Sequence, residues 1–123
     1  MLELIDIGVE KAVAFRCGGK ISEEEMSLVL SAIKERIDIH GEVYIYEEIE
    51  SIGGVEFDAI IEKIKFFHEV GISKIKKIAV ITDKKWMQKI IKLEDTLLTK
   101  IVIKGFPYDE KEKGVDFLRE IKP

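Results

Sequence analysis

Alternating apolar and polar residues open the chain. Residues 2–8 alternate leucine with glutamate at their start, and residues 11–17 (KAVAFRC) form a second, mostly apolar run. A period of two residues is typical of a β-strand with one buried face. Only a short turn separates the two runs, so we predict that they pair as a hairpin. The Gly-Gly-Lys sequence at 18–20 then ends the second strand.

Helical spacing replaces this alternation from Ser22 onward. Ser22 and Glu25 have the spacing of a capping box, in which each side chain binds the other residue's backbone amide. The apolar stripe that follows at helical spacing comprises Met26, Val29, Leu30, Ile33 and Ile37. Gly41 is placed to end this helix.

The same spacing predicts three further helices. The second has its apolar face over residues 57–67 and ends at Gly71, and the third starts near Asp83. A second capping box, with Asp109 as the cap and Glu112 as its partner, predicts the start of the last helix.

Three more apolar segments predict strands, at residues 42–49, 76–82 and 100–106. The short, β-branched run at 76–82 is typical of a buried central strand. The resulting order is β-β-α-β-α-β-α-β-α, and right-handed crossovers between alternating strands and helices give parallel pairing. We therefore predict an α/β fold with a five-stranded, mostly parallel sheet, an N-terminal hairpin and four helices. No linker divides the chain, so residues 1–123 are expected to form a single domain.

Composition places the chain among globular proteins. Apolar residues make up 46% of the sequence and charged residues 36%. No apolar run has the length of a membrane span, and the acidic start lacks the pattern of a secretory signal. Cys17 is the single cysteine, so no internal disulfide can form. These features predict a cytoplasmic location.

Charge is distributed unevenly along the chain. Residues 1–62 carry five basic and fifteen acidic side chains, whereas residues 63–104 carry eleven lysines and four acids. Such a dipolar chain is compatible with a homodimer or with an anionic partner. Binding to nucleic acid is not expected, because the lysines lack interleaved aromatics and the whole chain is acidic. The absence of asparagine fits a thermophilic source, although codon bias explains the composition almost as well.

Motifs for catalysis and metal binding are missing from the sequence. The CGGKIS segment is not a phosphate-binding loop, because Ala14 stands in place of its first glycine and Ile21 in place of its hydroxyl ligand. His40 and His68 are the two histidines, and neither has the spacing of a metal motif. No nucleophile stands beside an oriented histidine. We therefore expect neither an enzyme nor a bound cofactor or metal.

One segment, ITDKKWM, has the position of a binding site. It joins the predicted central strand to the third helix, and open α/β sheets bind ligands where such strands end. Asp83 is placed to cap that helix, and Lys84 beside a helix N-terminus favours an anion. Trp86, the single tryptophan, is either a packing anchor or part of a binding surface.

Several short motifs carry a resemblance to a known family. They are Gly-Lys-Ile-Ser at 19–22, Lys65-Phe66, Ile78-Ala79-Val80 followed by Asp83, Lys84 and Trp86, and Phe106. In this order and spacing, over about residues 1–121, the chain resembles the SpoIIAA-like branch of the STAS superfamily, typified by anti-sigma-factor antagonists. That branch is also similar to CRAL-TRIO lipid-binding domains.

The resemblance implies a non-enzymatic module that binds partner proteins. Some STAS domains are switched by phosphorylation of a serine at the start of the second helix. Residues 54–58 contain no serine or threonine here, and Ser51, in the preceding loop, is the nearest hydroxyl. The similarity to CRAL-TRIO domains implies an apolar ligand pocket and a peripheral membrane contact.

Two functional hypotheses follow. The first is a regulatory module that binds a small apolar or anionic molecule, such as a lipid, with Lys65, Asp83, Lys84 and Trp86 at the edge of the second and third helices. The second is regulation through a protein partner, of the anti-sigma-antagonist type but without the usual phosphoserine, with Ser51 or its acidic loop as the contact.

Overall fold

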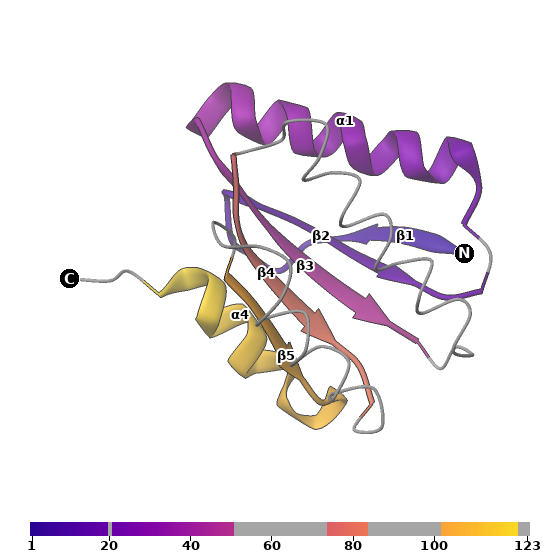
Figure 1. The fold of residues 1–123 in the computed structure, drawn as a ribbon, viewed down its shortest axis with the longest axis vertical. Helices are drawn as coiled ribbons and strands as arrows, with labels where there is room; N and C mark the ends of the chain where they lie inside the picture. The colour runs from indigo at the N-terminus through magenta and orange to yellow at the C-terminus, as the bar shows by residue number, and fades with distance from the viewer. Residues whose placement is uncertain (20, 51–73, 84–101, 121–123) are drawn as a thin grey trace.

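The computed structural model describes residues 1–19, 21–50, 74–83 and 102–120. Five strands form one sheet in the order β1-β2-β3-β4-β5 (Figure 1). Their bounds are Leu2–Ile5 for β1, Ala12–Cys17 for β2, Val43–Ile49 for β3, Ile75–Ile81 for β4 and Val102–Phe106 for β5. β1 pairs with β2 in antiparallel orientation, and the other three pairs are parallel. The predicted five-stranded, mostly parallel sheet with an N-terminal hairpin is confirmed.

The hairpin differs from its prediction in length. β1 ends at Ile5, three residues earlier than the alternation predicted. The chain turns at Asp6, whose Oδ1 accepts a hydrogen bond from the Gly8 amide at 2.8 Å. Gly8 has a φ of 76°, in the left-handed region that favours glycine. This Asx-type turn ends the strand even though apolar residues continue beyond it.

Helix α1, Glu23–His40, begins and ends where the sequence indicates. The Ser22 hydroxyl accepts from the Glu25 amide, and the Glu25 carboxylate accepts from the Ser22 amide, which confirms the capping box. The second carboxylate oxygen of Glu25 accepts from the Leu2 amide at 2.7 Å, so the same side chain ties the helix to β1. Gly41, with a φ of 78°, ends the helix.

The last helix starts later than predicted. A 3₁₀ turn, η2, covers Tyr108–Glu110 and leads into α4, Lys111–Arg119. Asp109 lies within the 3₁₀ turn, and no side chain caps α4. The predicted capping box at Asp109 is therefore wrong: φ of Pro107 is −72°, and the chain tightens into a 3₁₀ turn directly after it.

Two of the four predicted helices, α1 and α4, are present in the described part of the chain. The predicted helix over residues 57–71 and the one starting near Asp83 fall outside the described residues. No helix in the described ranges is long and apolar enough to cross a membrane.

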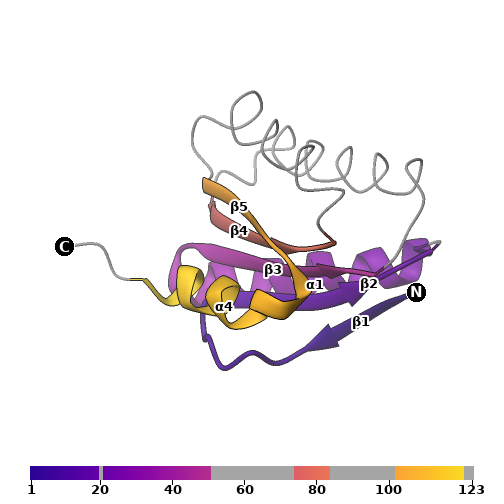
Figure 2. The ribbon, with the colours of Figure 1, turned by 90° about the horizontal axis from the view of Figure 1, so that it is seen from below.

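The two helices cover opposite faces of the sheet (Figures 1 and 2). α1 packs on β1, β2 and β3, and α4 packs on β3, β4 and β5. Successive side chains of each strand point to opposite faces of the sheet, so they pack into two separate cores. The α1 core includes Val13, Phe15, Val29, Ile33, Ile45 and Ile78. The α4 core includes Ala12, Ala14, Tyr46, Ala79, Ile81, Phe106 and Leu118.

α4 approaches the sheet closely at Gly114. A Cβ atom at this position would lie 2.8 Å from Cδ1 of Ile81 and 3.3 Å from Cδ2 of Phe106. Because Gly114 has no side chain, α4 can come into contact with β4 and β5. Lys77 of β4 secures the other end of α4, since its Nζ donates to the carbonyls of Phe117 and Glu120.

Candidate functional site

Polar side chains gather at the carboxyl edge of the parallel strands, where the arrows of β2, β3 and β4 in Figure 1 end. Open α/β sheets bind ligands at this edge. The residues that contribute are Arg16 and Cys17 of β2, Tyr46, Glu47 and Glu48 of β3, Thr82 and Asp83 after β4, and Tyr108 and Lys111 after β5. We call this set the carboxyl-edge cluster.

Glu48 is the centre of the cluster on the α4 face. Its side chain is only 6% exposed, although it carries a charge. Tyr46 donates its hydroxyl to Oε2 at 2.9 Å, and Arg16 Nε lies 3.4 Å from Oε1. Lys111 Nζ lies 3.1 Å from the same Oε1. These contacts join β2, β3 and α4 through one carboxylate.

The contacts determine the ionisation of Glu48. Burial alone would raise the pKa of this carboxyl, but the hydrogen bonds from Tyr46, Lys111 and Arg16 lower the pKa below its ordinary value. The hydrogen bond and charge of Glu48 in turn raise the pKa of Arg16. Glu48 is therefore a buried carboxylate that stays ionised because three donors surround it.

A second part of the cluster has polar atoms without partners. Within the described ranges, Oγ1 of Thr82, Oδ1 of Asp83 and the hydroxyl of Tyr108 are buried and form no hydrogen bond. Burial and the nearby negative charges, that of Asp83 foremost, raise the pKa of Tyr108 to about 12. Tyr108 is therefore a neutral phenol beside an acid, and Lys111 Nζ lies 6.0 Å from its ring centroid.

Two polar residues of the cluster lie on the α1 face. Cys17 is fully buried, and its Sγ lies 3.8 Å from Oε1 of Glu47. Glu47 is 4% exposed. No group of three or more metal-ligating side chains that could hold an ion occurs among the described residues. What the cluster offers chemically is hydrogen bonding and fixed charge.

Of the site residues predicted from the sequence, Asp83 lies in the cluster. Lys65, Lys84, Trp86 and Ser51 fall outside the described residues, so their role stays a prediction. The helix that Asp83 was predicted to cap also lies outside them.

Sequence reasoning missed the residues that hold the cluster together. Tyr46, Glu48 and Lys111 were not predicted as site residues, although the segment YIYEEI offered a signal. Adjacent glutamates inside an apolar strand place one carboxylate on each buried face, because strand side chains alternate. A charge that is buried in this way needs partners. Two of the partners of Glu48, Arg16 and Lys111, come from segments far away in the sequence.

Comparison with known proteins identifies the family. A family model described as SpoIIAA-like matches residues 12–119. The chain therefore belongs to the SpoIIAA-like family, of the STAS superfamily, as its motifs predicted. No curated protein and no solved structure matches the chain.

Proposed function

We propose that this member of the SpoIIAA-like family is a non-catalytic regulatory module that binds a small amphipathic molecule at the carboxyl-edge cluster. The observation that carries the proposal is the set of buried, unpaired polar atoms on Thr82, Asp83 and Tyr108. A buried polar atom without a partner costs about 1–3 kcal/mol. Three such atoms at one edge of a sheet are accounted for if a ligand supplies their hydrogen bonds.

The unpaired atoms indicate the head group of the ligand. Asp83 accepts hydrogen bonds, whereas the neutral phenol of Tyr108 can both donate and accept. A hydroxyl or amide group matches both residues, and an anionic head group would face repulsion from Asp83. If Trp86 forms part of a binding surface, one of the two roles that the sequence leaves open, the apolar body of the ligand would lie against it.

The rest of the cluster provides a rigid support for this site. Glu48 joins three elements through its bonds with Tyr46, Arg16 and Lys111. Lys111 opens α4 directly after the 3₁₀ turn that contains Tyr108. The ion pair of Lys111 with Glu48 therefore fixes the segment that positions the phenol, and a site held in this way loses little entropy on binding.

Tryptophan fluorescence tests the proposal, because Trp86 lies three residues after Asp83. We expect saturable changes with 1-decanol, and weaker ones with decanoate and with phosphatidylglycerol vesicles. Asp83→Asn keeps an acceptor oxygen but removes its charge, and Tyr108→Phe removes the phenol hydroxyl. Each should weaken the 1-decanol response by about tenfold, because a hydrogen bond to a charged acceptor is stronger than one to a neutral acceptor and because the phenol contact is lost outright.

Matched variants make the result specific. Asp109→Asn removes an exposed charge near the cluster, and Tyr44→Phe removes a phenol hydroxyl from the opposite end of β3. Both should bind 1-decanol as the wild type does. A wild-type spectrum that is unchanged by all three probes would count against the proposal. Tighter binding of decanoate than of 1-decanol would instead indicate that an anionic head group binds at the predicted lysines, Lys65 and Lys84.

Regulation through a protein partner is the second candidate, favoured by membership of the SpoIIAA-like family. Glu50 is exposed, and its Oε1 lies 3.9 Å from Arg16 Nε, so an ion pair holds the residue that precedes Ser51. If the loop is the contact, Ser51→Asp should change which protein is retained from native lysate. The same variant should leave the 1-decanol response intact.

A further inference from the structure

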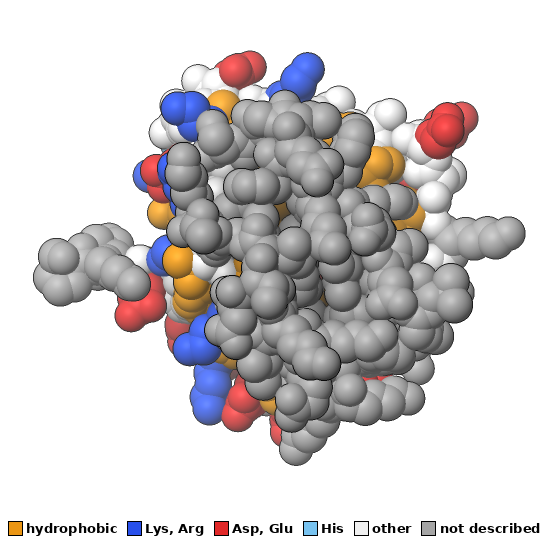
Figure 3. All heavy atoms as spheres, viewed as in Figure 1, with side chains coloured by type: hydrophobic (Ala, Val, Ile, Leu, Met, Phe, Trp, Pro, Cys, Tyr) orange, Lys and Arg blue, Asp and Glu red, His pale blue; other side chains and the backbone are white. Residues whose placement is uncertain are grey.

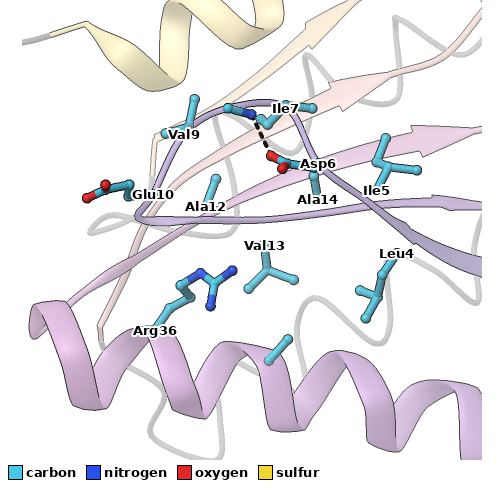
Figure 4. A pocket seen from close by; sticks show the side chains of 12 residues that line it. Leu4, Ile5, Asp6, Ile7, Val9, Glu10, Ala12, Val13, Ala14 and Arg36 are labelled. Carbon is cyan, nitrogen blue, oxygen red and sulfur yellow. Dashed lines mark hydrogen bonds between the residues drawn. The ribbon is translucent and has the colours of Figure 1, made fainter.

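A cavity lies between the hairpin and α1, at the end of β2 opposite to the carboxyl-edge cluster (Figure 4). Its volume is about 470 Å³, within the range of small-molecule sites. Most of the residues that line it are apolar. Leu4 and Val13 point toward α1 and Arg36, whereas Ile5, Ile7 and Val9 pack against the α4 core on the other face of the sheet (Figure 4). The cavity exists because β1 ends early and the chain from Asp6 to Glu10 bows away from β2.

Arg36 brings a positive charge to this apolar cavity. Figure 4 shows its side chain rising from α1 toward β2, beside Val13. Nη1 of Arg36 donates to Glu35 at 3.1 Å, but Nε is buried and has no hydrogen-bond partner among the described residues. A guanidinium is always charged and matches the geometry of a carboxylate. Its buried Nε therefore needs an acceptor oxygen that the described chain does not supply.

The acidic residues of the loop limit how much negative charge the cavity accepts. Asp6 and Glu10 are both exposed and line the cavity, and Oδ1 of Asp6 already accepts from the Gly8 amide. A ligand with one negative charge can pair with Arg36 while staying clear of these carboxylates. A multiply charged anion such as phosphate would be repelled.

We propose that this cavity binds a small monocarboxylate with a short apolar chain. The carboxylate pairs with Nε of Arg36, and the chain lies against Leu4, Val13 and Ala32. This site shares no residue with the carboxyl-edge cluster, so an experiment can refute either binding proposal without affecting the other.

Isothermal titration with hexanoate tests the proposal on the full chain. Arg36→Gln should weaken hexanoate binding by about tenfold or more, as expected for a lost hydrogen bond to a charged group. Lys34→Gln removes an exposed charge from the same helix and should leave the affinity unchanged. Asp83→Asn, which alters the other site, should also leave it unchanged.

Two further ligands, one neutral and one polyanionic, test which charge the cavity prefers. We expect 1-hexanol to bind at least tenfold more weakly than hexanoate, and phosphate not to compete. Equal binding of hexanol, competition by phosphate, or an unaffected Arg36→Gln variant would each overturn the proposal. Methyl chemical shifts of Leu4 and Val13 in the wild type, recorded with hexanoate, give a test that does not depend on folding of the variant. Unshifted signals from both residues at saturation would equally overturn it.

Discussion

Replacing Glu48 with glutamine removes the charge at the centre of the carboxyl-edge cluster and keeps the shape of the side chain. Tyr46 can still donate to the amide oxygen of the glutamine. Arg16 and Lys111, however, lose the carboxylate oxygen that both approach, at 3.4 and 3.1 Å. We therefore expect Glu48→Gln to lower the free energy of unfolding at neutral pH.

The magnitude follows from the geometry. Hydrogen bonds to charged groups contribute about 1.5–3 kcal/mol each, and breaking a fully buried ion pair costs more. The side chains of Arg16 and Lys111 are 35% and 43% exposed, so water can partly replace the hydrogen bonds that they lose with Glu48. We expect a loss of about 2 kcal/mol, which for a domain of this size lowers Tm by about 6–10 °C.

The pH dependence of this loss has a definite sign. The folded pKa of Glu48 lies below its ordinary value of 4.5, so the ionised carboxylate stabilises the fold above that pH. The stabilisation is lost as pH falls through the folded pKa. Urea unfolding should therefore show the largest difference between wild type and Glu48→Gln at pH 6–7, and the difference should shrink below about pH 4.5.

Asp38→Asn provides the matched control, because Asp38 is exposed on α1 and far from the cluster. Its effect should stay within about 0.5 kcal/mol, as is usual for surface positions. If Glu48→Gln were no more destabilising than this control, or if its effect did not depend on pH, the ion pairs around Glu48 would not stabilise the fold.

Three further outcomes can be checked by similar means. Ser22→Ala removes the cap of α1 and should cost about 1 kcal/mol in urea unfolding, whereas Ser31→Ala, at an exposed position of the same helix, should not destabilise; equal effects would contradict the capping role. Gly114→Val should cost about 2–3 kcal/mol because it forces α4 away from β4 and β5, while Lys113→Val, at an exposed position of α4, controls for helix propensity. Burial raises the pKa of all three tyrosines, that of Tyr108 to about 12, so absorbance at 295 nm should show less phenolate at pH 10 in the folded protein than in urea, where about half of the phenols ionise; a folded protein that titrates like the unfolded one would refute the burial.

The strands and the first helix could be predicted because their signals are local. Ser22, Glu25 and Gly41 determine the limits of α1 through contacts within a few residues, and the sequence places them correctly. The hairpin turn at Asp6 and the 3₁₀ turn before α4 were not predicted. In both cases a local backbone conformation competes with a pattern that otherwise favours a longer strand or an earlier helix.

The site was predicted less completely because it is built by the sheet register. Arg16 lies opposite Glu48 in the pairing of β2 with β3, and Lys111 reaches Glu48 from a segment more than sixty residues away. Neither proximity can be read from spacing along the chain. Asp83 could be found because a strand end that precedes a helix has a recognisable local pattern.

Surface charge beside the C-terminal part of α4 also depends on the fold. Figure 3 shows Lys and Arg side chains beside hydrophobic ones along one margin of the molecule. Within the described residues, Lys77 and Lys104 each lie over the ring of Phe117, at 5.4 and 6.0 Å. The sequence indicated that aromatics are not interleaved with the lysines, and the fold brings them together from β4, β5 and α4.

Native mass spectrometry of the gently isolated protein would test ligand binding at the carboxyl edge in a single spectrum. We expect the wild type to retain a small molecule, and the same spectrum to report whether the chain is a monomer or a homodimer, with which its charge distribution is compatible. Asp83→Asn should lose the retained mass, and Asp109→Asn should keep it. A bare wild-type polypeptide, or a retained mass that is unaffected by Asp83→Asn, would contradict a ligand site at the carboxyl-edge cluster.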